Sequence, residues 1–201
     1  MTFFLLLIIF LSDFFLRTHV KLEKFYGTTC YLISITNADD FIKMWNDKLG
    51  KDGVTIDGVV LLFHGTTDRI GFSFHTNKYD EDVLMMDNIS KLDTKTMDTL
   101  IILSCKAGAI PKSGTNFATT MARRMNATYL IASDGNVGAY NITEKFSIGT
   151  DKTYILLETT KNPVGFKVYT KDSDGIVSAR KIGTIFKGIN NLIFAAKITP
   201  Y

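Results

Sequence analysis

Two residues with complementary chemistry, His64 and Cys105, each directly follow a largely apolar run of the chain. Residues 59–63 precede the histidine, and residues 100–104 precede the cysteine. Functional sites of open α/β sheets form at the carboxyl ends of strands, and neighbouring strands lie about 4.8 Å apart. An imidazole beside a thiol takes its proton or balances its charge. The pattern therefore predicts a dyad in which His64 is the base and general acid and Cys105 the nucleophile.

Glycines beside both residues fit acyl-transfer chemistry. Gly65 follows the histidine directly, so its backbone can approach a substrate closely and its N–H can point at a developing oxyanion. The N–H of Cys105 is the second expected oxyanion donor. Gly108 allows the sharp turn that lifts the nucleophile out of a sheet.

The order of these residues along the chain excludes two common hydrolase types. All three histidines, His19, His64 and His75, precede Cys105. Papain-like enzymes need a later histidine, and the α/β-hydrolase elbow also needs glycine two positions before and after the nucleophile. The remaining arrangement has histidine first and cysteine about 40 residues later, near the caspase separation of about 50. His75 lies in a polar stretch, and we expect it to be exposed.

The elements that must position the dyad follow from hydrophobic periodicity. Apolar and β-branched runs alternate with an amphipathic helix capped by Asn37 or Asp39 and another capped by Thr115 or Asn116. We expect an α/β domain with a mainly parallel central sheet, flanking helices and additional antiparallel strands. The predicted segments are strands over 29–36, 56–63, 100–103 and 128–132, a helix over 40–49, a hairpin of 70–74 with 83–86, and late strands over 153–157, 165–169 and 176–181.

The first residues stand apart from this pattern. Residues 3–11 are wholly apolar, but the run is shorter than the roughly 20 residues of a membrane span. A signal, an anchor and a remnant of something upstream all stay open, so residues 1–20 are set apart from a domain over 21–201. Basic residues follow the run, which would leave an anchored domain on the cytoplasmic side. We favour a cytoplasmic protein over an anchored or secreted one, with membrane association only through residues 3–16.

Composition limits the classes of molecule that the chain is expected to bind. A net charge of +3, with no basic stripe interleaved with aromatics, gives no basis for nucleic-acid binding. There are two cysteines. Cys30 lies in an apolar run and is expected to be a buried core thiol, and no cysteine pair has metal-ligand spacing. We therefore expect no metal or other cofactor, and a protein or peptide as substrate.

Several segments together resemble a known superfamily. They are residues 62–65 (Leu-Phe-His-Gly), residues 102–108 (Ile-Leu-Ser-Cys-Lys-Ala-Gly), the helix start at 116–118, the strand at 129–134 and the hairpin strand at 165–169. Across about residues 29–181 the chain resembles the caspase-like, clan CD cysteine peptidases, and it is similar especially to bacterial CHAT-type and toxin-associated members. The resemblance implies a caspase-like three-layer sandwich and an endopeptidase that works through a His–Cys dyad without a metal. Gln-Ala before the cysteine and Arg-Gly after it are missing, so the aspartate specificity of eukaryotic caspases is not implied.

Three questions stay open at this level. Asp134 follows a predicted strand and is a candidate for a pocket that takes a basic residue, although we favour a turn residue before Gly135. The alternative to a peptidase is a catalytically inactive caspase-like binding or signalling module, which would tend to lose the dyad that this chain keeps. A membrane-associated structural protein rests on residues 3–11 alone.

Overall fold

The computed structural model describes seven stretches of the chain, residues 5–10, 29–50, 56–72, 83–110, 114–144, 152–160 and 165–198. Its helices are α2 (Ala38–Asp47), α3 (Phe117–Arg124), α4 (Ile189–Ile198) and the 3₁₀ helix η1 (Met86–Lys91). Its strands are β1 (Leu5–Phe10), β2 (Thr29–Ser34), β3 (Ile56–Leu62), β4 (His64–Gly65), β5 (Arg69–Gly71), β6 (Val83–Met85), β7 (Thr96–Leu103), β8 (Asn126–Ser133), β9 (Asn136–Glu144), β10 (Lys152–Thr160), β11 (Phe166–Lys171), β12 (Val177–Gly183) and β13 (Ile185–Lys187).

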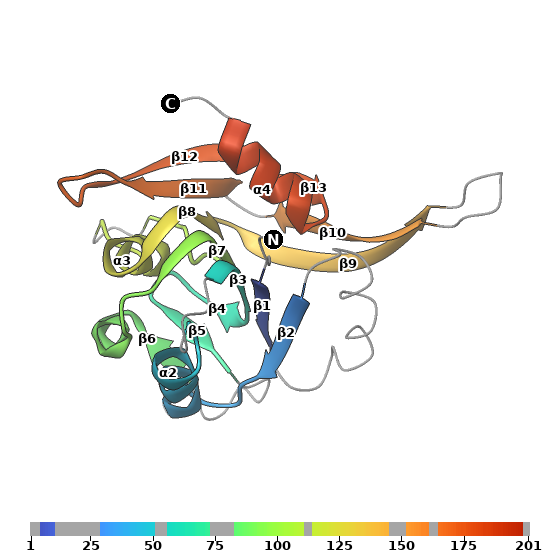
Figure 1. The fold of residues 1–201 in the computed structure, drawn as a ribbon. Helices are drawn as coiled ribbons and strands as arrows, with labels where there is room; N and C mark the ends of the chain where they lie inside the picture. Colours follow the sequence, from blue (N-terminus) through green and yellow to red (C-terminus); the bar gives the residue numbers. More distant parts are fainter. Residues whose placement is uncertain are drawn as a thin grey trace.

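A mixed sheet forms the centre of the described structure (Figure 1). Its strand order is β12-β11-β8-β7-β3-β1-β2. The five strands from β8 to β2 in this order are parallel to their neighbours, whereas β11 and β12 are antiparallel. The predicted α/β class is therefore confirmed, as is the parallel pairing of the strand before His64 with the strand before Cys105.

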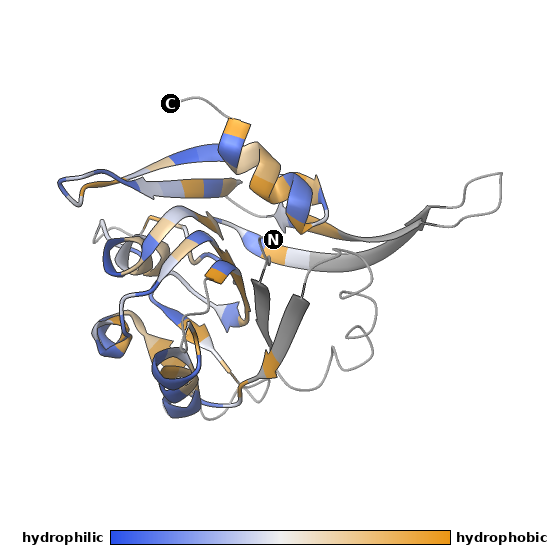
Figure 2. Cartoon of the chain, in the orientation of Figure 1, coloured by the Kyte–Doolittle hydropathy of each residue, from blue (hydrophilic) through white to orange (hydrophobic). Residues whose placement is uncertain are grey.

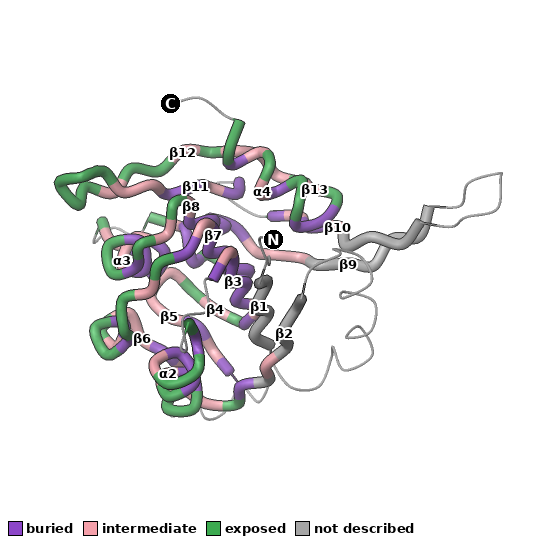
Figure 3. Tube along the Cα trace, viewed as in Figure 1, coloured by how far each residue is buried: buried purple, intermediate pink, exposed green. Residues whose placement is uncertain are grey.

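Side chains of the central strands alternate between two cores, because successive residues of a strand point to opposite faces. On β7, Leu100 and Ile102 belong to the core on the side of α2 and α3, while Ile101 and Leu103 belong to the core on the side of α4. Figure 3 shows buried residues gathered on these strands and exposed residues on the outer turns of the helices and on β12. Both faces of the sheet are covered, which explains why the strands read as nearly continuous apolar runs.

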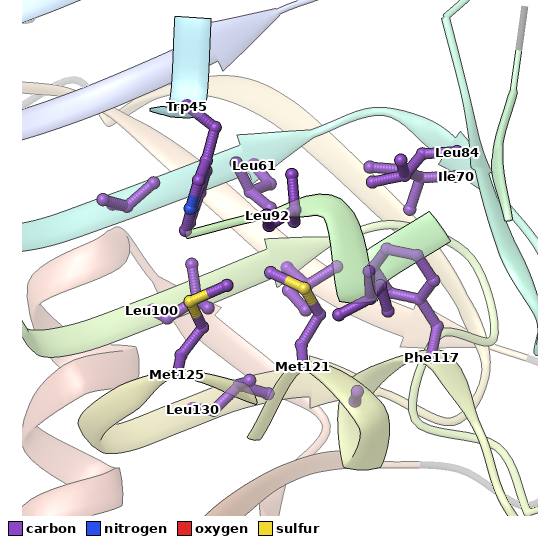
Figure 4. Packing of buried hydrophobic residues seen from close by; sticks show 14 of the residues in the cluster. Trp45, Leu61, Ile70, Leu84, Leu92, Leu100, Phe117, Met121, Met125 and Leu130 are labelled. Atoms are coloured by element: carbon purple, nitrogen blue, oxygen red, sulfur yellow. The ribbon is translucent and has the colours of Figure 1, made fainter. Parts of the chain in front are cut away.

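The larger core joins two helices and three strands that are distant in the sequence (Figure 4). Trp45 of α2 and Met121 of α3 meet Leu61, Leu100 and Leu130 from three neighbouring strands. Each of these five side chains is at most 1% exposed. At about 25 cal/mol per Å² of buried apolar area, clusters of this kind supply most of the stabilisation of a fold. The strands that lead to His64 and Cys105 are therefore held by a closely packed core.

Asparagines cap the first two helices, as the sequence predicts. The Asn37 side chain accepts a hydrogen bond from the Asp40 N–H at 2.8 Å, and the Asn116 side chain accepts one from the Thr119 N–H at 2.7 Å. Each bond satisfies an N–H that has no partner within its helix. The helix expected over 40–49 begins at Ala38 and ends at Asp47.

The hairpin expected after the histidine is present as an antiparallel sheet of β4, β5 and β6. Ile70 pairs with Leu84 in this sheet, and Gly71 pairs with Val83. The polar stretch that contains His75 lies outside the described residues, so its expected exposure stays a prediction.

The late strands are confirmed, but they belong to two different sheets. β11 pairs with β8 and thereby joins the central sheet, and β12 follows it as the edge strand. β9 and β10 form a long antiparallel ribbon that continues from β8 (Figure 1). β13 pairs with β10 on the side opposite β9. The sequence reading missed β9, β13 and α4. Figure 2 shows hydrophobic residues along α4 and hydrophilic ones on β12, in line with a helix that packs on the sheet and a strand at its edge.

The apolar beginning of the chain also belongs to the sheet. Residues 5–10 form β1, which lies between β2 and β3 and pairs in parallel with both. The sequence reading set residues 1–20 apart from the domain and did not consider this role. An apolar run of this length also fits a strand buried in a parallel sheet. None of the described helices is long and apolar enough to cross a membrane.

Candidate active site

The register of two parallel strands brings the histidine and the cysteine to one sheet edge. Leu62 of β3 is opposite Leu103 of β7 in the last pair of their ladder. The Phe63 N–H then donates to the Leu103 carbonyl at 3.3 Å. His64 and Cys105 each follow this pair at the same offset, so the structure places both predicted residues at the carboxyl edge of neighbouring strands.

The histidine begins a short hairpin whose geometry orients the backbone of Gly65. The Thr66 N–H donates to the Arg69 carbonyl at 3.0 Å, and Gly65 is opposite Ile70 in the ladder. In antiparallel pairs, hydrogen-bonded and non-hydrogen-bonded positions alternate. Gly65 is therefore at a non-hydrogen-bonded position, and its N–H points away from β5. This orientation suits the oxyanion donor expected from the sequence.

Aromatic packing holds this hairpin to the domain. Phe63, directly before the histidine, is 5% exposed and stacks edge-to-face on Phe72 with ring centroids 4.8 Å apart. Both rings also contact Phe41 of α2, at 6.1 and 5.6 Å between centroids. Aromatic pairs of this kind contribute about 0.5–1.5 kcal/mol beyond their buried area. His64 itself is exposed at the surface.

Gly65 and Ser104 form the direct contact between the histidine hairpin and the cysteine strand. A methyl group on Gly65 would overlap the Ser104 hydroxyl and would lie 2.8 Å from the Arg69 carbonyl oxygen. Ser104 is 1% exposed, and its hydroxyl has no hydrogen-bond partner among the described residues. A side chain at position 65 would therefore require the Ser104 hydroxyl to rotate and the β4–β5 hairpin to open.

Cys105 begins a tight turn that is tied to the end of β8. Lys106 has a φ of 58°, a left-handed conformation that is costly for a residue with a side chain. Its N–H donates to the Gly135 carbonyl at 2.8 Å, and the Gly108 N–H donates to the Ser133 carbonyl at 2.7 Å. These bonds over-determine the turn and support its strained residue, as is typical of functional sites.

The Cys105 sulfur is partly exposed and accepts a hydrogen bond. The donor is the backbone N–H of Val137, at 3.4 Å from Sγ. This bond places the sulfur against the start of β9. The sequence reading missed this contact, because Val137 follows Cys105 by a whole helix and strand and carries no motif.

The start of α3 joins both loops. The Phe117 N–H donates to the Thr67 carbonyl of the histidine hairpin at 2.8 Å, and the Ala118 N–H donates to the Ala107 carbonyl of the cysteine turn at 3.0 Å. The first N–H groups of a helix lack partners within the helix. Here they serve as a clamp between the two halves of the predicted dyad.

Asp134 lies at the same edge but is almost wholly buried. It is 3% exposed, and its Oδ2 forms an ion pair with Lys167 Nζ at 3.0 Å. Its N–H donates to the Gly165 carbonyl at 3.1 Å, which joins the end of β8 to the residue before β11. Its Oδ1 has no hydrogen-bond partner among the described residues. The negative charge of Asp134 is thus balanced within the chain.

One carboxyl group of the hairpin has a shifted pKa. The Thr66 hydroxyl donates to Asp68 Oδ1 at 2.5 Å, and Arg69 lies beside the same carboxylate. These contacts, the Thr66 hydrogen bond first, lower the pKa of Asp68 below its ordinary value of 3.8. Asp68 is therefore ionised at neutral pH and holds the turn next to the histidine.

The described part of the chain contains no cluster of three or more histidine, cysteine, aspartate or glutamate side chains that could hold a metal ion. Comparison of the whole sequence with protein-family models and with curated proteins finds no match. The chemistry of the site must therefore be argued from its own residues.

Proposed function

We propose that this chain is a cysteine endopeptidase of the caspase-like superfamily, with His64 and Cys105 as its catalytic dyad. One observation carries the proposal. Beyond the last pair of β3 and β7, His64 and Cys105 follow at equal offsets, and Gly65 packs directly on Ser104. A mixed sheet with helices on both faces is also what a caspase-like sandwich requires.

The first half of the proposed reaction forms an acyl-enzyme. The Cys105 thiolate attacks the carbonyl carbon of the scissile peptide bond, and the electron pair of the C=O moves to oxygen. The N–H groups of Gly65 and Cys105 stabilise the resulting oxyanion. The tetrahedral intermediate collapses as the His64 imidazolium gives its proton to the leaving amine. The products are a thioester on Cys105 and a free amine.

The second half regenerates the enzyme. His64, now neutral, takes a proton from water, which attacks the thioester carbonyl. Collapse of the second tetrahedral intermediate breaks the C–S bond and releases a carboxylic acid, leaving thiolate and imidazolium. No metal or cofactor takes part in this proposal.

The substrate is a protein or peptide, and the residue preferred before the cut is a separate question. A preference for a basic residue through Asp134 stays a prediction. Lys167 already neutralises this carboxylate, so a basic substrate side chain would have to compete with an internal cation. Profiling against a peptide library tests the point, and a strong preference for aspartate or for a large apolar residue would remove Asp134 from the pocket.

The decisive experiment uses thiol reactivity. A thiol-directed peptide probe is expected to label the wild type and Cys30→Ala but not Cys105→Ala. In addition, His64→Ala is expected to slow Cys105 alkylation at neutral pH and to abolish peptide hydrolysis, because an imidazolium lowers the pKa of a neighbouring thiol.

Two results would count against the enzyme. Equal labelling of wild type and Cys105→Ala would reject it, as would identical alkylation–pH curves for wild type and His64→Ala with a thiol pKa of about 8.5. An activated thiol without any hydrolysis of peptides or unfolded proteins would favour the inactive binding or signalling module instead.

A further inference from the structure

A tyrosine from the late part of the chain reaches under the cysteine turn. Tyr169 lies on β11 and is 2% exposed. Its hydroxyl donates to the Gly108 carbonyl at 2.9 Å. A methyl group on Gly108 would lie 2.8 Å from that hydroxyl oxygen. The close approach therefore depends on glycine at this position, and the bond fixes the end of the turn that Cys105 begins.

The same hydroxyl is linked to the helix that clamps the site. The Asn116 side chain, 1% exposed, lies close enough to the Tyr169 hydroxyl to lower its pKa. The Asn116 Oδ1 also caps α3 through the Thr119 N–H. The helix start that Asn116 caps binds Thr67 on the histidine side and Ala107 on the cysteine side.

We propose that Tyr169 and Asn116 are positioning residues that set the placement of Cys105 relative to His64, an inference that rests on the proposed function. Tyr169 ties the cysteine turn to β11, and Asn116 places the capped end of α3 beside the Tyr169 hydroxyl. The first turn of α3 then holds the histidine hairpin. Neither side chain touches the reacting atoms in this role.

The protonation state of Tyr169 fits a permanent donor. Burial, its largest influence, raises the pKa of Tyr169 to about 12, with a smaller contribution from the nearby Asp134 carboxylate. The hydroxyl therefore stays protonated over the whole range in which a His–Cys dyad titrates, and it takes no part in proton transfer. Ionisable groups around the cysteine turn in the described part of the chain include His64 on β4, Lys106 in the turn, Asp134 after β8 and its partner Lys167 on β11.

The test compares Tyr169→Phe with Tyr129→Phe. Tyr129 lies on β8, packs with the core on the opposite face and has Lys197 Nζ 6.0 Å from its ring. Tyr169→Phe is expected to slow Cys105 alkylation at pH 7 and to lower kcat by about ten- to hundredfold, since small misplacements of reacting groups cost this much. KM should change little, and Tyr129→Phe should behave as wild type in both measurements.

A merely structural role predicts a different result. In that case Tyr169→Phe would have a lower unfolding free energy, but the alkylation–pH curve of the folded variant would coincide with that of the wild type. Coinciding curves would therefore overturn the proposal. Asn116→Ser gives a second route, because serine keeps the helix cap but withdraws the amide from Tyr169. It is expected to shift the curve in the same direction, and an unshifted curve in this folded variant would also overturn the proposal. If the wild-type thiol itself shows an ordinary pKa, the proposed function fails and this inference fails with it.

Discussion

Replacement of Gly65 by alanine tests the contact on which the site depends. The added methyl group would overlap the Ser104 hydroxyl and would lie 2.8 Å from the Arg69 carbonyl oxygen. The carbonyl belongs to the backbone of the same hairpin and cannot rotate away. The β4–β5 hairpin must therefore open at Gly65 and the Ser104 hydroxyl must rotate out of the way, so the backbone next to His64 shifts.

The size of the effect follows from the packing. Inserting a methyl group into a closely packed site costs about 1–3 kcal/mol, so we expect Gly65→Ala to lower the unfolding free energy by about 2 kcal/mol. A displacement of about 1 Å at the reacting groups costs on the order of 100-fold in rate. If the proposed dyad exists, Cys105 alkylation at pH 7 should slow, because His64 is then displaced relative to the thiol.

Gly71→Ala is the matched control on the same hairpin. Gly71 is opposite His64 in the ladder, yet a methyl group there meets only the His64 Cβ and Val83 Cγ1, both at 3.9 Å. Because glycine in a strand costs about 0.5–1 kcal/mol relative to alanine, this variant should be neutral or slightly more stable. Unfolding in urea can be followed by the fluorescence of Trp45, the single tryptophan, which is 0% exposed. Equal stability and equal alkylation rates of Gly65→Ala and Gly71→Ala would refute the reasoning.

Two further predictions concern buried ionisable groups. Because the pKa of Tyr169 is raised, the folded state keeps a proton that the unfolded chain loses above about pH 10. The unfolding free energy should therefore fall by roughly 2 kcal/mol as pH rises from 10 to 12. Urea titrations of Tyr169→Phe should show a smaller alkaline loss than those of the wild type. Asp134→Asn leaves Lys167 without its partner in a largely buried ion pair and should lower the unfolding free energy by about 3 kcal/mol. The double variant Asp134→Asn, Lys167→Met should recover most of this loss. No recovery would show that the ion pair is not the cause.

Much of the fold could be predicted because its central strands are covered on both faces. A strand such as β7 has buried side chains at nearly every position, and this produces an unbroken apolar run that the sequence displays directly. The asparagine caps were equally readable, since their chemistry is local. β9 and α4 were not predicted. In β9, polar residues and Gly138 interrupt the apolar ones, so no continuous apolar run marks the strand. In α4, Phe194 is 62% exposed, which obscures the amphipathic pattern.

The candidate site divides along the same line between local and long-range effects. The positions of His64 and Cys105 follow from where two apolar runs end, and that information lies within a few residues of each. Their juxtaposition depends on register, because shifting β3 against β7 by two residues would separate them by about 6.6 Å along the strands. The groups that hold the arrangement, Val137 at the sulfur and Tyr169 beneath the turn, come from strands that follow Cys105 in the chain. A backbone N–H has no sequence signature. A buried tyrosine cannot be distinguished from any other core aromatic in the sequence, because the partner of its hydroxyl is known only from the structure. Local sequence therefore indicates the candidate residues of the site, whereas the pairing of distant strands determines how they are held.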